Sequence, residues 1–342
     1  MKAVTFASYG DASVLEYGDR PDPECGPDDI VLRVGAVGVN HVDIDMRNGT
    51  SRFPLQLPHT LGLEAGGTVV ETGSGVSGFS VGDRVTAMHQ LVCYRCDYCR
   101  AGVQQHCREL RILGVNAPGA YAEYLRVPAR SLRHLPDTLS FEAAAVTQTS
   151  AATAWHCLVT RGRLRPGEWV LVSAAGSGVG SIAIRLAKLL GARVITTAGS
   201  AGKLELARAS GADAVIDYRT EDVAAAVRDI TDGRGVDVAL EHIGGDNFTA
   251  CIASLAIRGR MVVCGGHAGE TVPLDLIALF RSEHEVIGCA RADETEIQAV
   301  LDLTASGALV PVIDSVFPLA QAAQAHRRME DRLQYGKLVL LP

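Results

Sequence analysis

Residues 169–190 have the sequence WVLVSAAGSGVGSIAIRLAKLL, and this stretch decides the fold. Trp169–Ser173 has the composition of a buried parallel strand, and an amphipathic helix begins directly after the glycine-rich segment. A strand that turns tightly into a helix directs backbone N–H groups and the positive helix end at a phosphate. Ala175 and Ser177 occupy the first two glycine places of the usual G-x-G-x-x-G pattern, and Gly180 holds the third. The stretch predicts a dinucleotide-binding turn made by Gly176, Ser177, Gly178, Val179 and Gly180, with a plain strand–helix turn as the alternative.

The segments that follow this turn repeat the same order of strand and helix. Predicted strands are Trp169–Ser173, Arg193–Thr197, Ala214–Ile216, Val236–Glu241 and Met261–Gly265. Helical patterns lie between them at Val179–Leu190, Lys203–Ala209 and Val223–Ile230. Strands that alternate with helices in this way indicate βαβ units. The prediction is therefore an α/β protein that contains a doubly wound parallel sheet.

The residues before Phe141 have a different pattern. Short apolar runs separated by Gly, Pro and Asp predict a mostly antiparallel β domain. These runs are Met1–Phe6, Ile30–Val39, Gly66–Thr72, Arg84–Met88 and Ala122–Val127. We expect this first domain to comprise residues 1–149 and 291–342, and the nucleotide-binding domain to comprise residues 150–290. In the C-terminal part, helices at Glu294–Ser306 and Leu319–Met329 and a strand at Lys337–Leu341 are expected.

The composition of the 342 residues excludes several classes of protein. Hydrophobic residues make up 47% and charged residues 21%, which excludes a disordered chain. Asp and Glu outnumber Lys and Arg by 39 to 32, so neither nucleic acid nor a membrane surface is expected as a partner. No stretch is typical of a secretory signal or a membrane span. Nine cysteines, an odd number, do not indicate a secreted disulfide framework, and the predicted location is cytoplasmic.

Four of the cysteines are closely spaced. Cys93, Cys96, Cys99 and Cys107 follow the spacing C-x2-C-x2-C-x7-C. Four thiolates on a short segment, here the lobe 93–107, satisfy the tetrahedral preference of zinc and leave no position for water. The spacing predicts one structural Zn²⁺, with reduced or disulfide-linked cysteines as the alternative. The other five are expected to be isolated buried thiols: Cys25, Cys157, Cys251, Cys264 and Cys289.

The strand after the glycine turn indicates which dinucleotide binds. NAD sites usually place Asp or Glu at the end of this strand, where the carboxylate binds the ribose 2′-hydroxyl. The segment from Val194 to Lys203 contains no carboxylate. Ser200 can donate a hydrogen bond to a 2′-phosphate, and Lys203 can supply a positive charge. The sequence therefore predicts NADPH as the cofactor. The alternative is that Lys203 is a solvated residue at the start of a helix and binds no phosphate.

These motifs together resemble those of the medium-chain dehydrogenase/reductase superfamily, which includes zinc-type alcohol dehydrogenases and quinone oxidoreductases. The resemblance covers nearly the whole chain and implies a GroES-like, mostly-β catalytic domain and a Rossmann domain. The matching segments are Gly38–Asp43, Gly62–Gly66, Val81–Val85, the cysteine lobe, Gly119–Tyr124, Ala174–Gly180 and Tyr335–Val339.

The chain departs from this resemblance at the catalytic metal. Zinc alcohol dehydrogenases hold a catalytic zinc with Cys, His and Cys, and the corresponding positions here are Asn40, Leu63 and Thr149. Leucine has no ligand atom, and Asn or Thr oxygens are poor substitutes for a thiolate. Val42 replaces the Ser or Thr that relays the alcohol proton. The resemblance therefore implies an active site without zinc beside an intact structural-zinc lobe.

The resemblance also implies roles for individual residues. His41 is expected at the pyrophosphate, Asn40 and Thr153 near the nicotinamide, and Tyr218 by the adenosine phosphate. His89 is the first candidate for the catalytic acid and His59 the second, with an ordinary structural or surface role as the alternative for each. His242 and His267 are expected to border the nicotinamide. Surface positions are expected for His106, His134, His284 and His326.

The sequence thus predicts an NADPH-dependent oxidoreductase. Without a metal to polarise the acceptor, the expected substrate is a small conjugated carbonyl compound, namely a quinone, an enone or an enoyl thioester. An aldehyde or ketone reductase, a biosynthetic non-redox enzyme of the same fold, and a nucleotide-holding interaction protein remain as alternatives. A homodimer or homotetramer is expected, because a sheet edge is exposed in this fold.

Overall fold

The computed structural model describes residues 1–342, and the chain forms two compact units. Unit 1 comprises Met1–Thr149, Asp293–Ser306 and Ile313–Pro342. Unit 2 comprises Ser150–Ala292 and Gly307–Val312. The predicted α/β class is confirmed, because unit 1 is mostly antiparallel β structure and unit 2 is built on a parallel sheet. None of the helices is both long enough and apolar enough to cross a lipid bilayer.

The centre of unit 1 is a seven-stranded sheet with the order β10-β6-β5-β3-β18-β17, in which β9 also pairs with β3. Its strands are β3 (Asp29–Val39), β5 (Glu64–Thr72), β6 (Arg84–Ala87), β9 (Tyr124–Pro128), β10 (Leu132–His134), β17 (Ile313–Pro318) and β18 (Lys337–Leu341). A second sheet contains β2 (Glu16–Asp19), β1 (Lys2–Phe6) and β4 (His59–Thr60), and β7 (Gln90–Leu91) pairs with β8 (Arg111–Ile112). The C-terminal strand β18 therefore lies beside β3, far from it in sequence.

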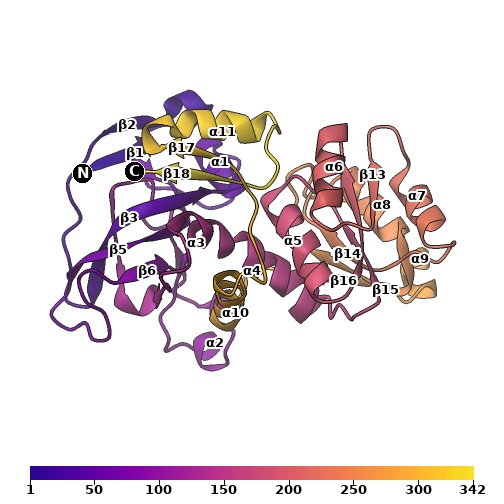
Figure 1. Cartoon of the computed structure of the whole chain (residues 1–342), viewed down its shortest axis with the longest axis horizontal. Coiled ribbons are helices and arrows are strands. Elements are labelled where there is room, and N and C mark those ends of the chain that lie inside the picture. The colour runs from indigo at the N-terminus through magenta and orange to yellow at the C-terminus, as the bar shows by residue number, and fades with distance from the viewer. The chain divides into compact units, whose positions relative to one another are not determined.

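The helices of unit 1 are mostly short. They are η1 (Ala12–Val14), α1 (His41–Asn48), α2 (Asp97–Arg100), η2 (Gln104–His106), η3 (Ala129–Ser131), α3 (Phe141–Thr147), α10 (Glu294–Ala305), η5 (Leu319–Gln321) and α11 (Ala322–Glu330). Helix α11 packs on β17 and β18 (Figure 1). Helix α1 was not expected from the sequence. Asn40 and Asp43 form a capping box at its start, in which each side chain accepts a hydrogen bond from the other residue's backbone N–H.

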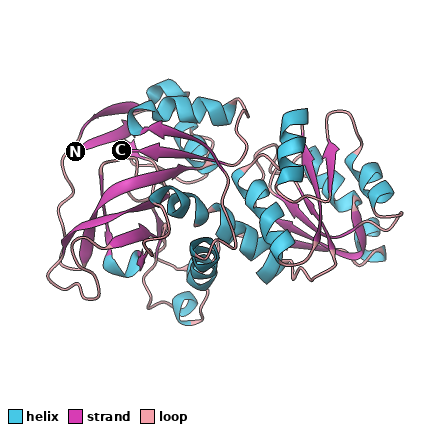
Figure 2. Ribbon diagram, in the orientation of Figure 1, coloured by secondary structure: helices cyan, strands magenta, loops and turns pink.

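Unit 2 has one six-stranded parallel sheet with the order β13-β12-β11-β14-β15-β16. The strands are β11 (Trp169–Val172), β12 (Arg193–Ala198), β13 (Ala214–Asp217), β14 (Val236–Glu241), β15 (Leu255–Val263) and β16 (Glu285–Gly288). The helices are α4 (Ser150–Trp155), the π-helix η4 (His156–Arg161), α5 (Gly178–Leu189), α6 (Ala201–Ala209), α7 (Val223–Ile230), α8 (Asp246–Ala253) and α9 (Leu276–Arg281). Helices lie on both sides of this sheet (Figure 2).

The strand order of unit 2 contains one point at which the direction of chain progression across the sheet reverses. The chain enters the sheet at β11, adds β12 and β13 on one side, and then returns to add β14, β15 and β16 on the other. The order of strands thus reverses between β11 and β14. Ligands of open α/β sheets bind outside the carboxyl ends of the strands at such a switch point. The glycine turn follows β11, at this position.

Candidate active site and zinc lobe

A buried polar cluster surrounds Glu64 in unit 1. The ammonium Nζ of Lys337 lies 2.7 Å from Glu64 Oε1, and it also donates to Asn40 Oδ1 at 2.6 Å and to the carbonyl of Val39 at 2.9 Å. Asn40 Nδ2 donates to the same Oε1 at 3.1 Å, and the backbone N–H of Thr149 donates to Oε2 at 2.8 Å. Both side chains of the ion pair are at most 5% exposed. The Glu64 carboxylate is therefore held by one cation and two neutral donors.

The central sheet explains why these residues meet. Strands β5 and β18 flank β3 on opposite sides, so Glu64 at the start of β5 and Lys337 at the start of β18 both lie near the end of β3. Gly38 makes room for the carboxylate, because a Cβ there would lie 2.9 Å from Glu64 Oε1 and 2.1 Å from the carbonyl oxygen of Ala145. Sequence reasoning missed Lys337 as a site residue. Its only signal was its position inside the Tyr335–Val339 motif.

Asn40 and Thr149 of this cluster, together with the neighbouring Leu63, stand at the three positions where the resemblance implied catalytic-zinc ligands, and these residues do not fit a zinc ion. Leu63 is a buried core residue without a ligand atom. Asn40 already accepts from the Lys337 ammonium, and the backbone of Thr149 donates to Glu64. A fixed positive charge at hydrogen-bond distance from Asn40 and Glu64 repels a divalent cation.

The buried carboxylate of Asp43 accepts hydrogen bonds that fix the backbone at the start of α1. Its Oδ2 accepts from the backbone N–H of Asn40 at 2.8 Å, and its Oδ1 accepts from that of Gly62 at 3.1 Å. The hydroxyl of Tyr121 lies 3.3 Å from Oδ2. Burial raises the pKa of Asp43 to about 7, although the two backbone amides act in the opposite direction. Asp43 is thus a structural carboxylate that holds the segment carrying Asn40.

The expected surface position of His326 is wrong, because this side chain is fully buried. Arg47 Nη1 lies 3.3 Å from His326 Nδ1, and Tyr121 Oη lies 3.1 Å from Nε2. Arg47 can only donate, so Nδ1 is the acceptor and Nε2 carries the proton and donates to Tyr121. Burial and the Arg47 charge lower the pKa of His326 to about 3. Arg47 also pairs with the exposed Glu330, so a chain of polar contacts runs from Glu330 at the surface through buried side chains to Asp43.

The histidines predicted to act in catalysis occupy different environments in unit 1. His89 is buried between β6 and β7. His59 lies in β4, where its ring packs edge-on against Phe6, and burial lowers its pKa. His41 is exposed at the first position of α1, with Nε2 3.7 Å from Asp45 Oδ1. Only His41 therefore lies at a helix N-terminus, where an anion is favoured.

The glycine turn of unit 2 has the local geometry of a phosphate site. The side chain of Ser177 caps α5, since its Oγ accepts from the backbone N–H of Gly180 at 2.8 Å. A Cβ at Gly180 would lie 2.2 Å from the carbonyl oxygen of Ala174, so only glycine fits there. The other predicted turn residues belong to the same segment: Gly176, Gly178 and Val179. The turn brings the N-terminus of α5 to the end of β11.

The residues predicted near the nicotinamide in unit 2 do not share one environment. His242 is buried directly after β14, and its Nε2 lies 3.0 Å from Ser177 Oγ. This contact places His242 beside the glycine turn. Thr153 is half-buried on α4, and His267 is exposed.

A polar group gathers at the ends of β12 and β13. A Cβ at Gly199 would lie 2.6 Å from Tyr218 Oη and 3.0 Å from Arg219 Nε, so both side chains reach over this glycine. Ser200 is the N-cap of α6, and Lys203 lies in the first turn of that helix. Sequence reasoning named Ser200, Lys203 and Tyr218 and missed Arg219. The Tyr-Arg pair directly after β13 was the available signal.

The cysteine lobe has the geometry of a metal site. The sulfur atoms of Cys93, Cys96, Cys99 and Cys107 all lie within 4.8 Å of one another. Backbone N–H groups donate to these sulfur atoms, as from Cys93 to Cys107 at 3.3 Å. Such bonds lower the pKa of Cys96 to about 6. An Asp97–Arg108 ion pair on the lobe surface joins its two halves. Four thiolates at this spacing fit a closed, tetrahedral Zn²⁺ site.

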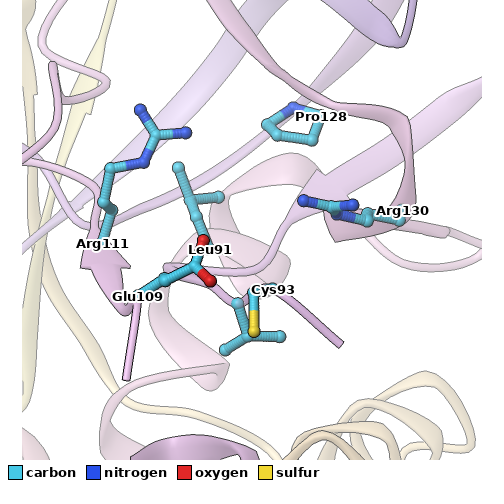
Figure 3. A pocket seen from close by; sticks show the side chains of 7 residues that line it. Leu91, Cys93, Glu109, Arg111, Pro128 and Arg130 are labelled. Carbon is cyan, nitrogen blue, oxygen red and sulfur yellow. The ribbon is translucent and has the colours of Figure 1, made fainter. Parts of the chain in front are cut away.

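A small hollow adjoins the lobe (Figure 3). Leu91 and Cys93 line it together with Glu109, Arg111 and Arg130. The guanidinium of Arg130 also lies 5.5 Å from the ring centroid of Tyr94. The volume of the hollow is about 80 Å³, whereas sites for organic ligands span about 300–1,000 Å³. The hollow is therefore too small for a dinucleotide or its substrate.

Comparisons with known proteins give the following relatives. Residues 26–137 match the alcohol dehydrogenase GroES-like domain, and residues 178–306 match the zinc-binding dehydrogenase family. A quinone oxidoreductase of Pseudomonas aeruginosa is 33% identical over 100% of this chain and 99% of its own length. A solved NAD-dependent alcohol dehydrogenase is 40% identical, covers 100% of both chains and has a TM-score of 0.96. Escherichia coli quinone oxidoreductase complexed with NADPH is 29% identical, with full coverage of both chains and a TM-score of 0.83.

Proposed function

Because the chain belongs to the medium-chain dehydrogenase/reductase superfamily, whose members named above are oxidoreductases, we propose that it is an NADPH-dependent reductase of conjugated carbonyl compounds. Its acceptor would be a quinone, an enone or an enoyl thioester. The Lys337–Glu64 ion pair carries this proposal, since it stands among the positions of the family's catalytic-zinc ligands. Without a Lewis acid, the acceptor must be activated by its own conjugation. We assign catalysis to residues 1–149 and 291–342, and nucleotide binding to residues 150–290.

The residues of unit 2 fit NADPH, which would supply the hydride when bound. The glycine turn and the N-terminus of α5 would hold the pyrophosphate, and the exposed His41 of unit 1 would add a donor. Ser200 and Lys203 would bind the 2′-phosphate, with Arg219 as a further cation beside Tyr218. The sequence places no carboxylate between Val194 and Lys203 to repel that phosphate.

Two residues of unit 1 would act on the acceptor. The negative charge that hydride addition leaves on the acceptor oxygen must be met by hydrogen-bond donors and finally by a proton. We assign the proton to the buried His89, because the other candidate, His59, packs against Phe6. The Asn40 amide, fixed by Lys337 and Glu64, would orient the reacting groups, with Thr153 of unit 2 beside the nicotinamide.

A screen of acceptors tests the proposal. NADPH oxidation should be fast with quinones, enones or enoyl thioesters and at least about 100-fold slower with simple aldehydes, because only the former accept hydride without a metal. His89→Ala should lower kcat at least about 100-fold, the usual contribution of a general acid, with unchanged NADPH binding. A preference for aldehydes would reject the proposal. NADPH binding without turnover on any acceptor would instead favour a non-redox or interaction protein.

A second candidate is an aldehyde or ketone reductase of the alcohol dehydrogenase kind. It is favoured by the 40% identity to a solved NAD-dependent alcohol dehydrogenase. This function would require a donor as effective as zinc at the carbonyl oxygen. His89 is the buried side chain of unit 1 that could supply it. The acceptor screen distinguishes the two candidates.

Lys203→Ala tests the cofactor. The variant should bind NADPH about tenfold to 100-fold more weakly, because it loses a charge-assisted bond to the 2′-phosphate worth about 1.5–3 kcal/mol. Binding of NADH should change little. Lys188→Ala, which removes an ion pair with Asp213, is the matched control on the same unit. Titration of both nucleotides by fluorescence measures the effect, and equal losses for the two nucleotides would reject the assignment.

We further propose a homodimer or homotetramer in the cytoplasm. Strand β16 forms one edge of the unit 2 sheet and exposes Val286, and α9 before it exposes Leu276, Ile277 and Phe280. A second copy that pairs along β16 would cover this apolar surface.

A reducing compartment suits the four cysteines of the lobe, because zinc binding needs thiolates.

A further inference from the structure

Asp43 and Arg47 lie one turn apart on α1, without a direct ion pair between them. Two side chains from other parts of unit 1 join them instead. His326 of α11 contacts Arg47 Nη1 through its Nδ1 at 3.3 Å. Tyr121, which precedes β9, has its Oη 3.1 Å from His326 Nε2 and 3.3 Å from Asp43 Oδ2. All four side chains are at most 1% exposed, and we call them the buried relay.

The donors of the buried relay all point toward Asp43. A guanidinium can only donate, so His326 accepts from Arg47 at Nδ1 and donates from Nε2 to the oxygen of Tyr121. The Tyr121 hydroxyl must then give its own proton to Asp43 Oδ2. The opposite direction would place a protonated Nδ1 against the Arg47 guanidinium. It follows that Asp43 accepts this hydrogen bond as an ionised carboxylate.

The same carboxylate holds two backbone segments at once. Asp43 Oδ2 accepts from the N–H of Asn40 at 2.8 Å, and Oδ1 accepts from the N–H of Gly62 at 3.1 Å. Asn40 precedes α1, and Gly62 lies two residues before Glu64 at the start of β5. The side chains of Asn40 and Glu64 are themselves joined at 3.1 Å. The carboxylate of Asp43 therefore fixes the spacing of the two segments that carry this contact.

The ionisation of Asp43 is sensitive to its neighbours. Burial raises its pKa to about 7, and the two backbone amides, the charge of Lys337 on β18 and the Tyr121 hydrogen bond act in the opposite direction. His326 and Arg47 act through Tyr121, and His326 stays neutral because its pKa is about 3. Since the pKa of Asp43 lies close to neutral pH, the loss of one donor changes the fraction of the side chain that is ionised.

We propose that Tyr121 and His326 are positioning residues for Asn40, which they place through the ionised carboxylate of Asp43. The proposal rests on the proposed function, in which the Asn40 amide orients the reacting groups. The buried relay does not carry a proton in from the surface, because the Arg47 guanidinium at its outer end does not release one. Its effect on the reaction is therefore confined to the placement of Asn40, and it should appear in kcat.

Tyr121→Phe tests the proposal in the zinc-loaded full chain, because it removes only the hydroxyl that joins His326 to Asp43. At pH 7 kcat should fall about tenfold to 100-fold, as for small misplacements of reacting groups, with little change in KM or NADPH binding. The acid limb of the pH profile of kcat, which Asp43 should set near pH 7, should move up by about one to two pH units. Tyr124→Phe, at a half-buried tyrosine of β9, is the matched control and should change neither. An unchanged kcat, or a lower kcat without a shift of the profile, would overturn the proposal.

Two measurements need no turnover, so they separate a failure of this proposal from a failure of the proposed function. Hydrogen exchange at pH 7 should be faster in Tyr121→Phe than in the wild type for peptides that contain Asn40 and Gly62, and unchanged for the glycine turn. Nitrogen NMR should find His326 neutral, with its proton on Nε2, from about pH 5 to pH 8. A proton on Nδ1, or unchanged exchange at both backbone sites, would overturn the proposal whatever the acceptor screen shows. Both expected results together with a failed acceptor screen would retain the buried relay and reject only the proposed function.

Discussion

Lys337→Met is expected to destabilise the protein by about 3–5 kcal/mol, the usual cost of leaving one partner of a buried ion pair uncompensated. Methionine has a similar length and fills the same space, but it cannot donate to Glu64, Asn40 or the carbonyl of Val39. The Glu64 carboxylate would then be fully buried with only neutral donors. Urea unfolding of the wild type and the variant measures the difference.

A double-mutant cycle separates the ion pair from packing. Glu64→Gln in the Lys337→Met background should recover at least about half of the loss, because the unpaired charge is gone. Lys2→Met is the matched control, since Lys2 forms an exposed ion pair with Asp19, which water screens, and this variant should be almost as stable as the wild type. If the double variant is no more stable than Lys337→Met, the unpaired charge of Glu64 is not the cause of the lost stability, and the prediction fails.

Metal analysis of the purified protein should give about one zinc per chain, and Cys99→Ser should lose it. Cys99 is the lobe cysteine placed between Cys96 and Cys107, and it is buried. Without the ion, the remaining sulfur atoms within 4.8 Å of one another would repel as thiolates, and the lobe would unfold locally. We expect a loss of more than about 4 kcal/mol, in the range typical of removing a structural metal.

Cys25→Ser is the control for the zinc prediction. Cys25 is half-buried in unit 1, and its thiol donates to the carbonyl of Asp29 at 3.3 Å, so zinc content should not change. Atomic absorption and thermal unfolding provide the two measurements. About two zinc ions per wild-type chain would contradict both this prediction and the proposal of an active site without a catalytic metal.

The features that depend on neighbours in sequence could be predicted from the residues. Strand β14 and helix α7 occupy the predicted residues, and the glycine turn opens α5 as expected. Local signals sufficed because periodicity, turn glycines and cysteine spacing act within about one helix turn or strand. Helix α1 was missed, because its apolar residues are few and its start depends on the Asn40–Asp43 capping box.

The features that depend on strand pairing could not be predicted from the residues. Lys337 and Glu64 are 273 positions apart, and they meet because β18 and β5 both pair with β3. His326 lies in a helix whose sequence does not distinguish a surface histidine from one enclosed by Arg47 and Tyr121.

The sequence by itself therefore determined the alternation of strands and helices in unit 2, the glycine turn and the group of four lobe cysteines. It also determined that leucine stands where a zinc ligand would be required. Only the tertiary structure decided that the ammonium of Lys337 lies beside Glu64 and Asn40. The physical reason is that local conformation is set by adjacent residues, whereas the partner of a buried charge is set by sheet register and by packing across the whole domain.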